Sequence, residues 1–151
     1  MIETGESFSN ETPDQVLVIG TLARGGVFTL QIEGGKRNNS GLQIDITGMG
    51  GDLKISNPLS FTNPNDNTVE GSQGDNEPLK ILPIPERYNY LPASKLDASV
   101  LDLAYLYHAF ASSRADNADH APDFNDAVKL HKLIDVISIA SESGSRRTVT
   151  S

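Results

Sequence analysis

The segment Val27-Phe28-Thr29-Leu30-Gln31-Ile32-Glu33 decides the fold class, because apolar and polar side chains alternate along most of it. Alternation with a period of two is typical of a β-strand that buries one face and leaves the other in water. Residues 42–48 repeat the pattern, with aliphatic side chains at every second position. The two segments predict two half-buried strands with matching faces.

Two further strands are predicted on either side of this pair. Residues 15–22 form a β-branched run that glycine bounds, and residues 52–56 form a short run after the glycines of 48–51. Connections rich in glycine and this short favour antiparallel neighbours, since a parallel crossover needs a dozen residues or more. We therefore expect the four strands to form an antiparallel meander.

The alternation assigns one aliphatic face and one polar face to this sheet. The aliphatic face is expected to be covered, whereas the polar face is a candidate interface between subunits or a surface that closes a substrate pocket. The candidate residues on the polar face are Thr29, Gln31, Gln43, Asp45 and Thr47.

The composition changes between residues 56 and 78, where Asn, Asp, Ser, Gly and Pro dominate. A long loop is expected there, with an edge strand near 68–70, and the sequence does not indicate its role. Residues 79–84 predict one more strand, and the prolines at 83 and 85 favour an edge position for it.

The last third of the chain changes to a helical period. Apolar residues at three- and four-residue steps predict a helix over about 98–113. A second helix is expected after Asp123, a good N-cap, and to end at Gly144. Residues 146–150 predict a final short strand.

Together these elements predict an α+β fold: an open, mostly antiparallel β-sheet with the two C-terminal helices packed on one face, as a two-layer sandwich. Residues 1–13 are expected to form a flexible lead-in, and residues 14–151 a single α+β domain. The 151 residues suit one domain.

Composition narrows the classes of partner. The chain has 12 Lys and Arg against 20 Asp and Glu, a formal charge of −8, which disfavours nucleic acid as a partner. It has no cysteine, so disulfides and thiolate chemistry are excluded. The start resembles no secretory signal, and no apolar run is long enough to cross a membrane. We expect a soluble, cytoplasmic chain with no membrane partner.

The sequence contains no complete catalytic or ligand motif. The glycines of 48–51 lie between strands, so they are interpreted as a turn and not as a dinucleotide loop. His108, His120 and His131 lie in separate predicted elements, which does not favour a metal site. No catalytic, cofactor-binding or metal-binding residue is assigned.

Two parts of the chain resemble a known family. Thr12–Leu22, Gly25-Gly26-Val27 and Gly48-Met49-Gly50-Gly51-Asp52-Leu53, followed by Pro122–Asp135 and Ala140–Gly144, look like the C-terminal domain of the glucose–fructose oxidoreductase/inositol dehydrogenase (Gfo/Idh/MocA) family. The likeness runs from about residue 12 to 150. The chain also resembles the C-terminal domain of the fungal galactose-pathway repressor, a non-enzymatic relative.

The resemblance implies a two-domain parent protein whose Rossmann domain binds NAD or NADP. The C-terminal domain would shape the site for a sugar, polyol or similar small molecule and form a homo-oligomer through its sheet. The family's Lys-Pro motif and Asp/His pair would lie upstream of residue 12, so this chain alone should hold no cofactor and be inactive. The alternatives are a domain of a non-enzymatic transcriptional regulator, or a free-standing binding or adaptor domain.

Overall fold

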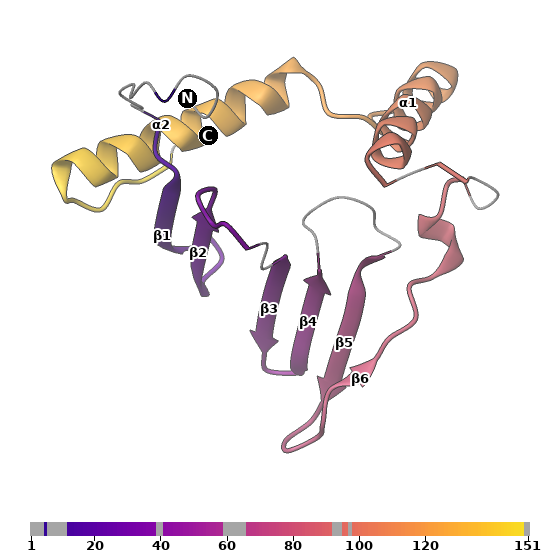
Figure 1. Cartoon of the computed structure of the whole chain (residues 1–151), viewed down its shortest axis with the longest axis horizontal. Helices are drawn as coiled ribbons and strands as arrows, with labels where there is room; N and C mark the ends of the chain where they lie inside the picture. The colour runs from indigo at the N-terminus through magenta and orange to yellow at the C-terminus, as the bar shows by residue number, and fades with distance from the viewer. Residues whose placement is uncertain are drawn as a thin grey trace. The chain divides into compact units, whose positions relative to one another are not determined.

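A computed structural model describes Gly5 and residues 12–38, 41–58, 66–91, 95–96 and 98–149. The chain divides into two units: Met1–Asn38 with Lys132–Ser151, and Asn39–His131. Over the described residues, the strands form two open antiparallel sheets and are followed by two α-helices, as Figure 1 illustrates. The predicted α+β class is confirmed. The predicted lead-in falls mostly outside the described residues.

The first unit contains a β-hairpin of β1 (Gln15–Thr21) and β2 (Val27–Glu33). The turn between them is closed by bonds between Leu22 and Gly25 and between Gly26 and Leu22. Gly25 and Gly26 have φ values of +89° and +85°, a region that residues with a Cβ rarely adopt. The glycines thus fix where the chain reverses.

Gly20 has a packing role in the hairpin. It pairs directly with Phe28 across the two strands, and the Phe28 ring lies where a Cβ of residue 20 would be. The aromatic ring therefore covers the backbone at the one position of β1 that lacks a side chain. This contact links the two strands on the aliphatic face of the hairpin.

The C-terminal segment contacts the end of β1. Arg146 Nη2 donates a hydrogen bond of 2.6 Å to Thr21 Oγ1, a contact between residues 125 positions apart. Residues 145–149 are not in a strand. The predicted strand at 146–150 is therefore wrong over its described part, since a side chain and not a backbone ladder joins this segment to the hairpin.

The second unit contains a four-stranded antiparallel sheet in the order β3-β4-β5-β6. Its strands are β3 (Leu42–Gly48), β4 (Gly51–Asn57), β5 (Thr68–Gln73) and β6 (Lys80–Ile81). The prediction of one meander through β1 to β4 is corrected, because β2 and β3 belong to different sheets. Their connection holds eight residues, too long to impose pairing as a two-residue hairpin loop does.

The far side of this sheet also differs from expectation. The strand expected near residues 68–70 runs over 68–73 and lies between β4 and β6, so it is not an edge. The strand expected over 79–84 is paired at Lys80 and Ile81 only. A last bond joins Leu82 N–H to the Val69 carbonyl oxygen at 2.8 Å, and Pro83 then offers no N–H to continue the ladder.

The helices are α1 (Ala98–Asp116) and α2 (Phe124–Ser143). Asp123 caps α2, since its Oδ1 accepts the Asp126 N–H at 3.0 Å while Asp126 Oδ2 accepts the Asp123 N–H at 3.2 Å. Gly144, with φ +59°, follows the last turn. Both predicted end signals of α2 are confirmed.

The aliphatic face of the larger sheet stays partly open. Ile44, Ile46 and Leu53 are 38%, 50% and 42% exposed. The described residues include one buried hydrophobic side chain, Leu101 in α1, and none of α2 is buried. Within the Asn39–His131 unit, the described residues of α1 leave this face partly open, so the predicted packing of α1 on it is not seen there.

Candidate functional site

The predicted polar face begins on β2, where Thr29 and Gln31 are both exposed. Gln31 Nε2 donates to Glu33 Oε1 along the strand. The cross-strand partners of these two residues are Ile19 and Leu17, which are 76% and 70% exposed. On the hairpin this face is therefore mixed, because β1 contributes aliphatic side chains that strand periodicity in β2 alone did not predict.

The other three predicted residues, Gln43, Asp45 and Thr47, lie on β3 and are exposed. Gln43 Nε2 donates to Asp45 Oδ2 at 2.7 Å along the strand, so the amide orients the carboxylate. The structure thus distributes the five predicted residues over two sheets, two on β2 and three on β3.

The register brings further charges into line with Asp45. Asp45 pairs with Lys54 on β4, and Lys54 pairs with Glu70 on β5. Residues directly opposite each other on one face lie about 5 Å apart, close enough for opposite charges to attract. This charge row, Asp45–Lys54–Glu70, crosses three strands on the polar face. Sequence reasoning missed it, because it depends on register between strands.

A groove opens in the same unit where the chain leaves the sheet. Because Pro83 ends the ladder, the following residues separate from β5, and Pro85 continues extended at φ −61° and ψ 139°. The groove has a volume of about 440 Å³. Its lining residues are Asn67, Thr68, Val69, Ile81, Leu82, Pro83, Ile84, Pro85, Glu86, Tyr88 and Asn89.

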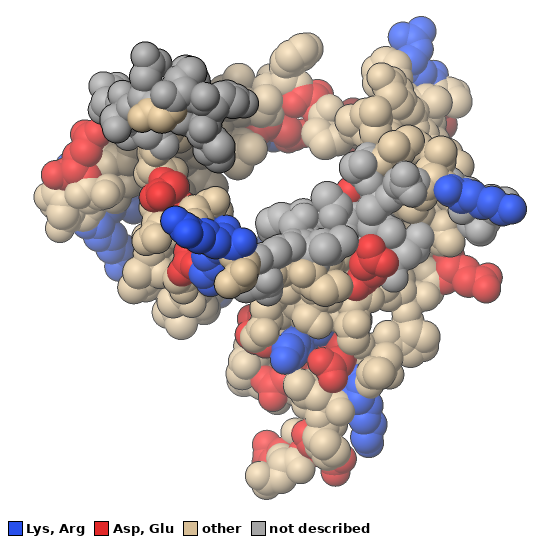
Figure 2. Space-filling model, viewed as in Figure 1, with Lys and Arg blue, Asp and Glu red and all other residues tan. Residues whose placement is uncertain are grey.

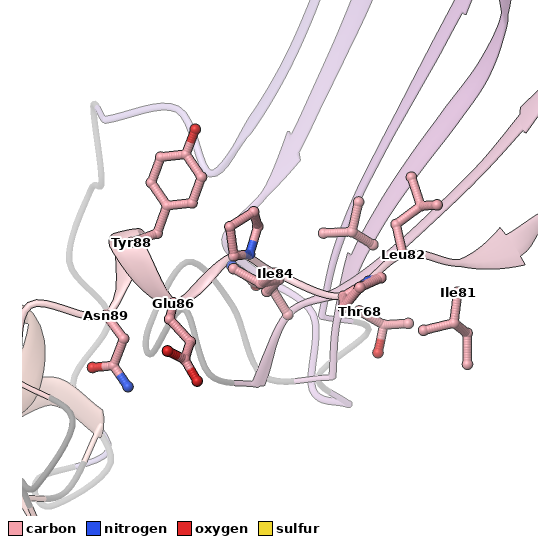
Figure 3. A pocket seen from close by; sticks show the side chains of 11 residues that line it. Thr68, Ile81, Leu82, Ile84, Glu86, Tyr88 and Asn89 are labelled. Atoms are coloured by element: carbon pink, nitrogen blue, oxygen red, sulfur yellow. The ribbon is translucent and has the colours of Figure 1, made fainter.

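Figure 3 shows how the polar side chains of this groove are directed. Glu86 and Asn89 extend to one side of the 81–89 segment, and Tyr88 extends to the opposite side. The three come from or directly follow the 3-10 helix η2 (Glu86–Tyr88). Glu86 is the single charged residue among the lining side chains. The groove therefore combines an aliphatic wall with amides, hydroxyls and one carboxylate.

An aromatic cluster holds the end of this segment on α1. The Tyr90 ring packs edge to face against Tyr105, with the ring centroids 5.5 Å apart, and stacks on His108, with the centroids 5.4 Å apart. Tyr105 Oη donates to Asn89 Oδ1 at 2.9 Å. Tyr90, although 52% exposed, is thus engaged as an anchor of this segment on α1.

A second groove, of about 810 Å³, lies at the other end of the sheet beside the β3–β4 turn. Glycines 48, 50, 51 and 71 line it together with Ile46, Leu53 and Leu82. Leu53 and Leu82 occupy the space over Gly71 where a Cβ would stand. The glycines interpreted as a turn in the sequence do form one, between paired Gly48 and Gly51.

The shifted ionisable groups cluster around the helix ends. The pKa of Asp116 is lowered, chiefly by a 2.7 Å hydrogen bond between its Oδ2 and His120 Nε2. The hydrogen bond from the Asp126 N–H lowers the pKa of Asp123. The hydrogen bond between the Asp126 and Lys129 side chains lowers the pKa of Asp126 and raises the pKa of Lys129. Capping and exposed pairing explain these groups. Within the described residues, no three acids or histidines gather as a metal site would require.

Figure 2 shows the Lys and Arg side chains of the visible face in small, separate groups. Neither described helix is both long enough and apolar enough to span a bilayer. Comparison with protein-family models, curated proteins and solved structures finds no match to this chain.

Proposed function

We propose that this chain is the C-terminal, substrate-shaping and dimerisation domain of an NAD(P)-dependent oxidoreductase that acts on a sugar, polyol or similar small molecule. The resemblance of residues 12–150 to the Gfo/Idh/MocA family motivates the class of enzyme. In this proposal the chain binds no dinucleotide itself and supplies a scaffold. Hydride transfer belongs to a Rossmann domain of the parent protein.

The observation that carries the dimerisation is the charge row on the polar face. Asp45 is exposed, and Lys54 and Glu70 are half-buried, so all three reach the surface of an open sheet. A row with the signs −, +, − can meet a second copy of itself around a two-fold axis. When the rows are offset by one strand, each lysine meets a carboxylate of the other copy. Such complementarity fixes register between subunits.

Sedimentation equilibrium of the full chain tests this interface. Lys54→Gln removes the single cation of the row and two lysine–carboxylate pairs per dimer. At about 0.5–1 kcal/mol per pair, the dimer dissociation constant should rise about 5- to 30-fold. Lys80→Gln is the matched control, because its register with Gly71 places it on the opposite face of the same sheet.

Two results would contradict the proposed interface: a monomer at every concentration, or equal effects of the two lysine substitutions. The division of labour has a separate test in NADH and NADPH fluorescence titrations. We expect no saturable binding to this chain. Binding of either dinucleotide to the chain alone would refute the proposal that the cofactor site lies in another domain.

A further inference from the structure

We propose that the groove beside Pro83 binds an extended, basic peptide segment of a partner protein, by adding a short strand at the place where β6 leaves β5. The groove, defined by its lining residues above, lies wholly within the Asn39–His131 unit. The proposal does not depend on the proposed oxidoreductase function or on the charge row.

Backbone hydrogen-bonding groups are available in the groove. Leu82 N–H donates to the Val69 carbonyl oxygen, but no return bond from Val69 N–H to Leu82 forms. Ile84 lies between two prolines, and neither its N–H nor its carbonyl oxygen is bonded within the described residues. An extended peptide offers both a donor and an acceptor at each residue, so it matches these groups.

Two side-chain amides of the groove, Asn67 and Asn89, are held in a fixed orientation. Asn67 Oδ1 accepts the Asn57 Nδ2 donor at 2.8 Å, and Asn89 Oδ1 accepts the Tyr105 hydroxyl at 2.9 Å. Each amide therefore has its oxygen engaged inside the protein, while its NH₂ group has no partner among the described residues. Amide donors fixed in this way suit the carbonyl oxygens of a peptide.

The charge and the size of the groove favour a short basic segment. Glu86 is the only charged residue of the lining, and residues 39–131 contain 13 acidic against 6 basic residues, a net charge of −7. A basic segment is attracted to such a surface and an acidic one is repelled. In β-sheets, neighbouring strands lie about 4.8 Å apart, packed sheets lie about 10 Å apart and each residue extends the strand by about 3.3 Å. The product of these three lengths gives a volume of about 160 Å³ for one extended residue. The 440 Å³ groove then accommodates about three residues.

Fluorescence anisotropy with labelled pentapeptides tests the proposal on the full chain. The probe alternates valine and lysine, and its control replaces lysine by glutamate. A third peptide carries the lysines but has N-methyl groups along one edge, which block strand addition. We expect saturable binding of the lysine peptide and binding of each control peptide that is weaker by about two- to tenfold.

Glu86→Gln should weaken binding of the lysine peptide about two- to fivefold, as expected for the loss of an exposed ion pair. Glu77→Gln removes an exposed carboxylate outside this groove and should leave binding of the peptide unchanged. Circular dichroism checks that both variants are folded. Equal affinity for the lysine and glutamate peptides, an unaffected N-methylated peptide, or an unchanged affinity of Glu86→Gln would overturn the proposal. Complete displacement of the labelled lysine peptide by butylamine would also overturn the proposal, because the groove would then bind small amines and not an extended peptide.

Discussion

Replacing Gly51 by alanine should disrupt the larger sheet, whereas the same change at its neighbour Gly50 should not. Gly51 has φ +142°, and a Cβ at this position would overlap the Ser72 carbonyl oxygen and lie 3.0 Å from Gln73 Cα. These atoms belong to the backbone of β5, so they cannot move aside as the end of a side chain can. At Gly50 nothing lies within 4 Å.

The cost of Gly51→Ala has two parts. A residue with a Cβ in this region of φ costs about 1–3 kcal/mol. Separating β4 from β5 to relieve the overlap weakens one or two ladder bonds, at about 0.5–1.5 kcal/mol each. The sum, about 1.5–6 kcal/mol, is a large share of the 5–15 kcal/mol that stabilises an ordinary domain. Gly50→Ala should be neutral or stabilise by up to about 1 kcal/mol.

Urea unfolding followed by circular dichroism of the strand signal measures both variants. We expect the midpoint of Gly51→Ala to fall far below that of the wild type, or its sheet signal to be lost without denaturant. The midpoint of Gly50→Ala should match or exceed the wild type. If the two variants unfold within about 0.5 kcal/mol of each other, the close approach of β4 and β5 at this residue is incorrect.

Three other changes test local features. Gly20→Ala should destabilise by about 1 kcal/mol through overlap with the Phe28 ring, and the added change Phe28→Val should recover part of the loss in thermal unfolding. Asn57→Ala should cost about 1–3 kcal/mol by the same measure, because Asn57 is 2% exposed and donates to Asn67. Asp123→Ala should shorten α2 and lower its helical signal. The pKa of Asp123 is lowered in the folded chain. Its contribution to stability is therefore complete above the carboxyl pKa of the unfolded chain and is lost as pH falls through the folded pKa. The stabilities of the variant and the wild type should converge in acid.

Periodicity predicted the elements that carry their own signal. Segments 27–33 and 42–48 are strands with the boundaries that alternation gives, and α2 begins after Asp123 and ends before Gly144. In each case the deciding information is local: a face, a cap or a glycine. Sequence therefore determined these elements well.

Pairing between elements was less predictable, because it depends on residues far apart in the chain. Alternation in β2 and β3 cannot tell whether the two strands are neighbours, and here they belong to different sheets. The interior strand β5 has Gly71 and polar residues where a strand pattern would show β-branched ones. The position of Pro83 indicated an edge, but not that pairing would end at Ile81 with one further bond from Leu82.

The candidate site shows the same limit. Asp45 was identified as a polar-face residue, yet its partners Lys54 and Glu70 became evident only from register. The groove was not predicted, because it forms where the segment after β6 separates from β5. Asn67 and Glu86, which both line it, are 19 positions apart in the sequence. A proline following a short strand, with acidic and aromatic residues after it, is the signal that could have pointed to this place.

The proposed dimer is tested most directly by nuclear magnetic resonance on a mixed sample in which one copy is isotope-labelled and the other is not. We expect contacts between copies at the Thr47 methyl group and the Lys54 side chain, on the polar face. Contacts at Ile44 and Ile46 instead, on the aliphatic face, or no contacts between copies at all, would contradict it.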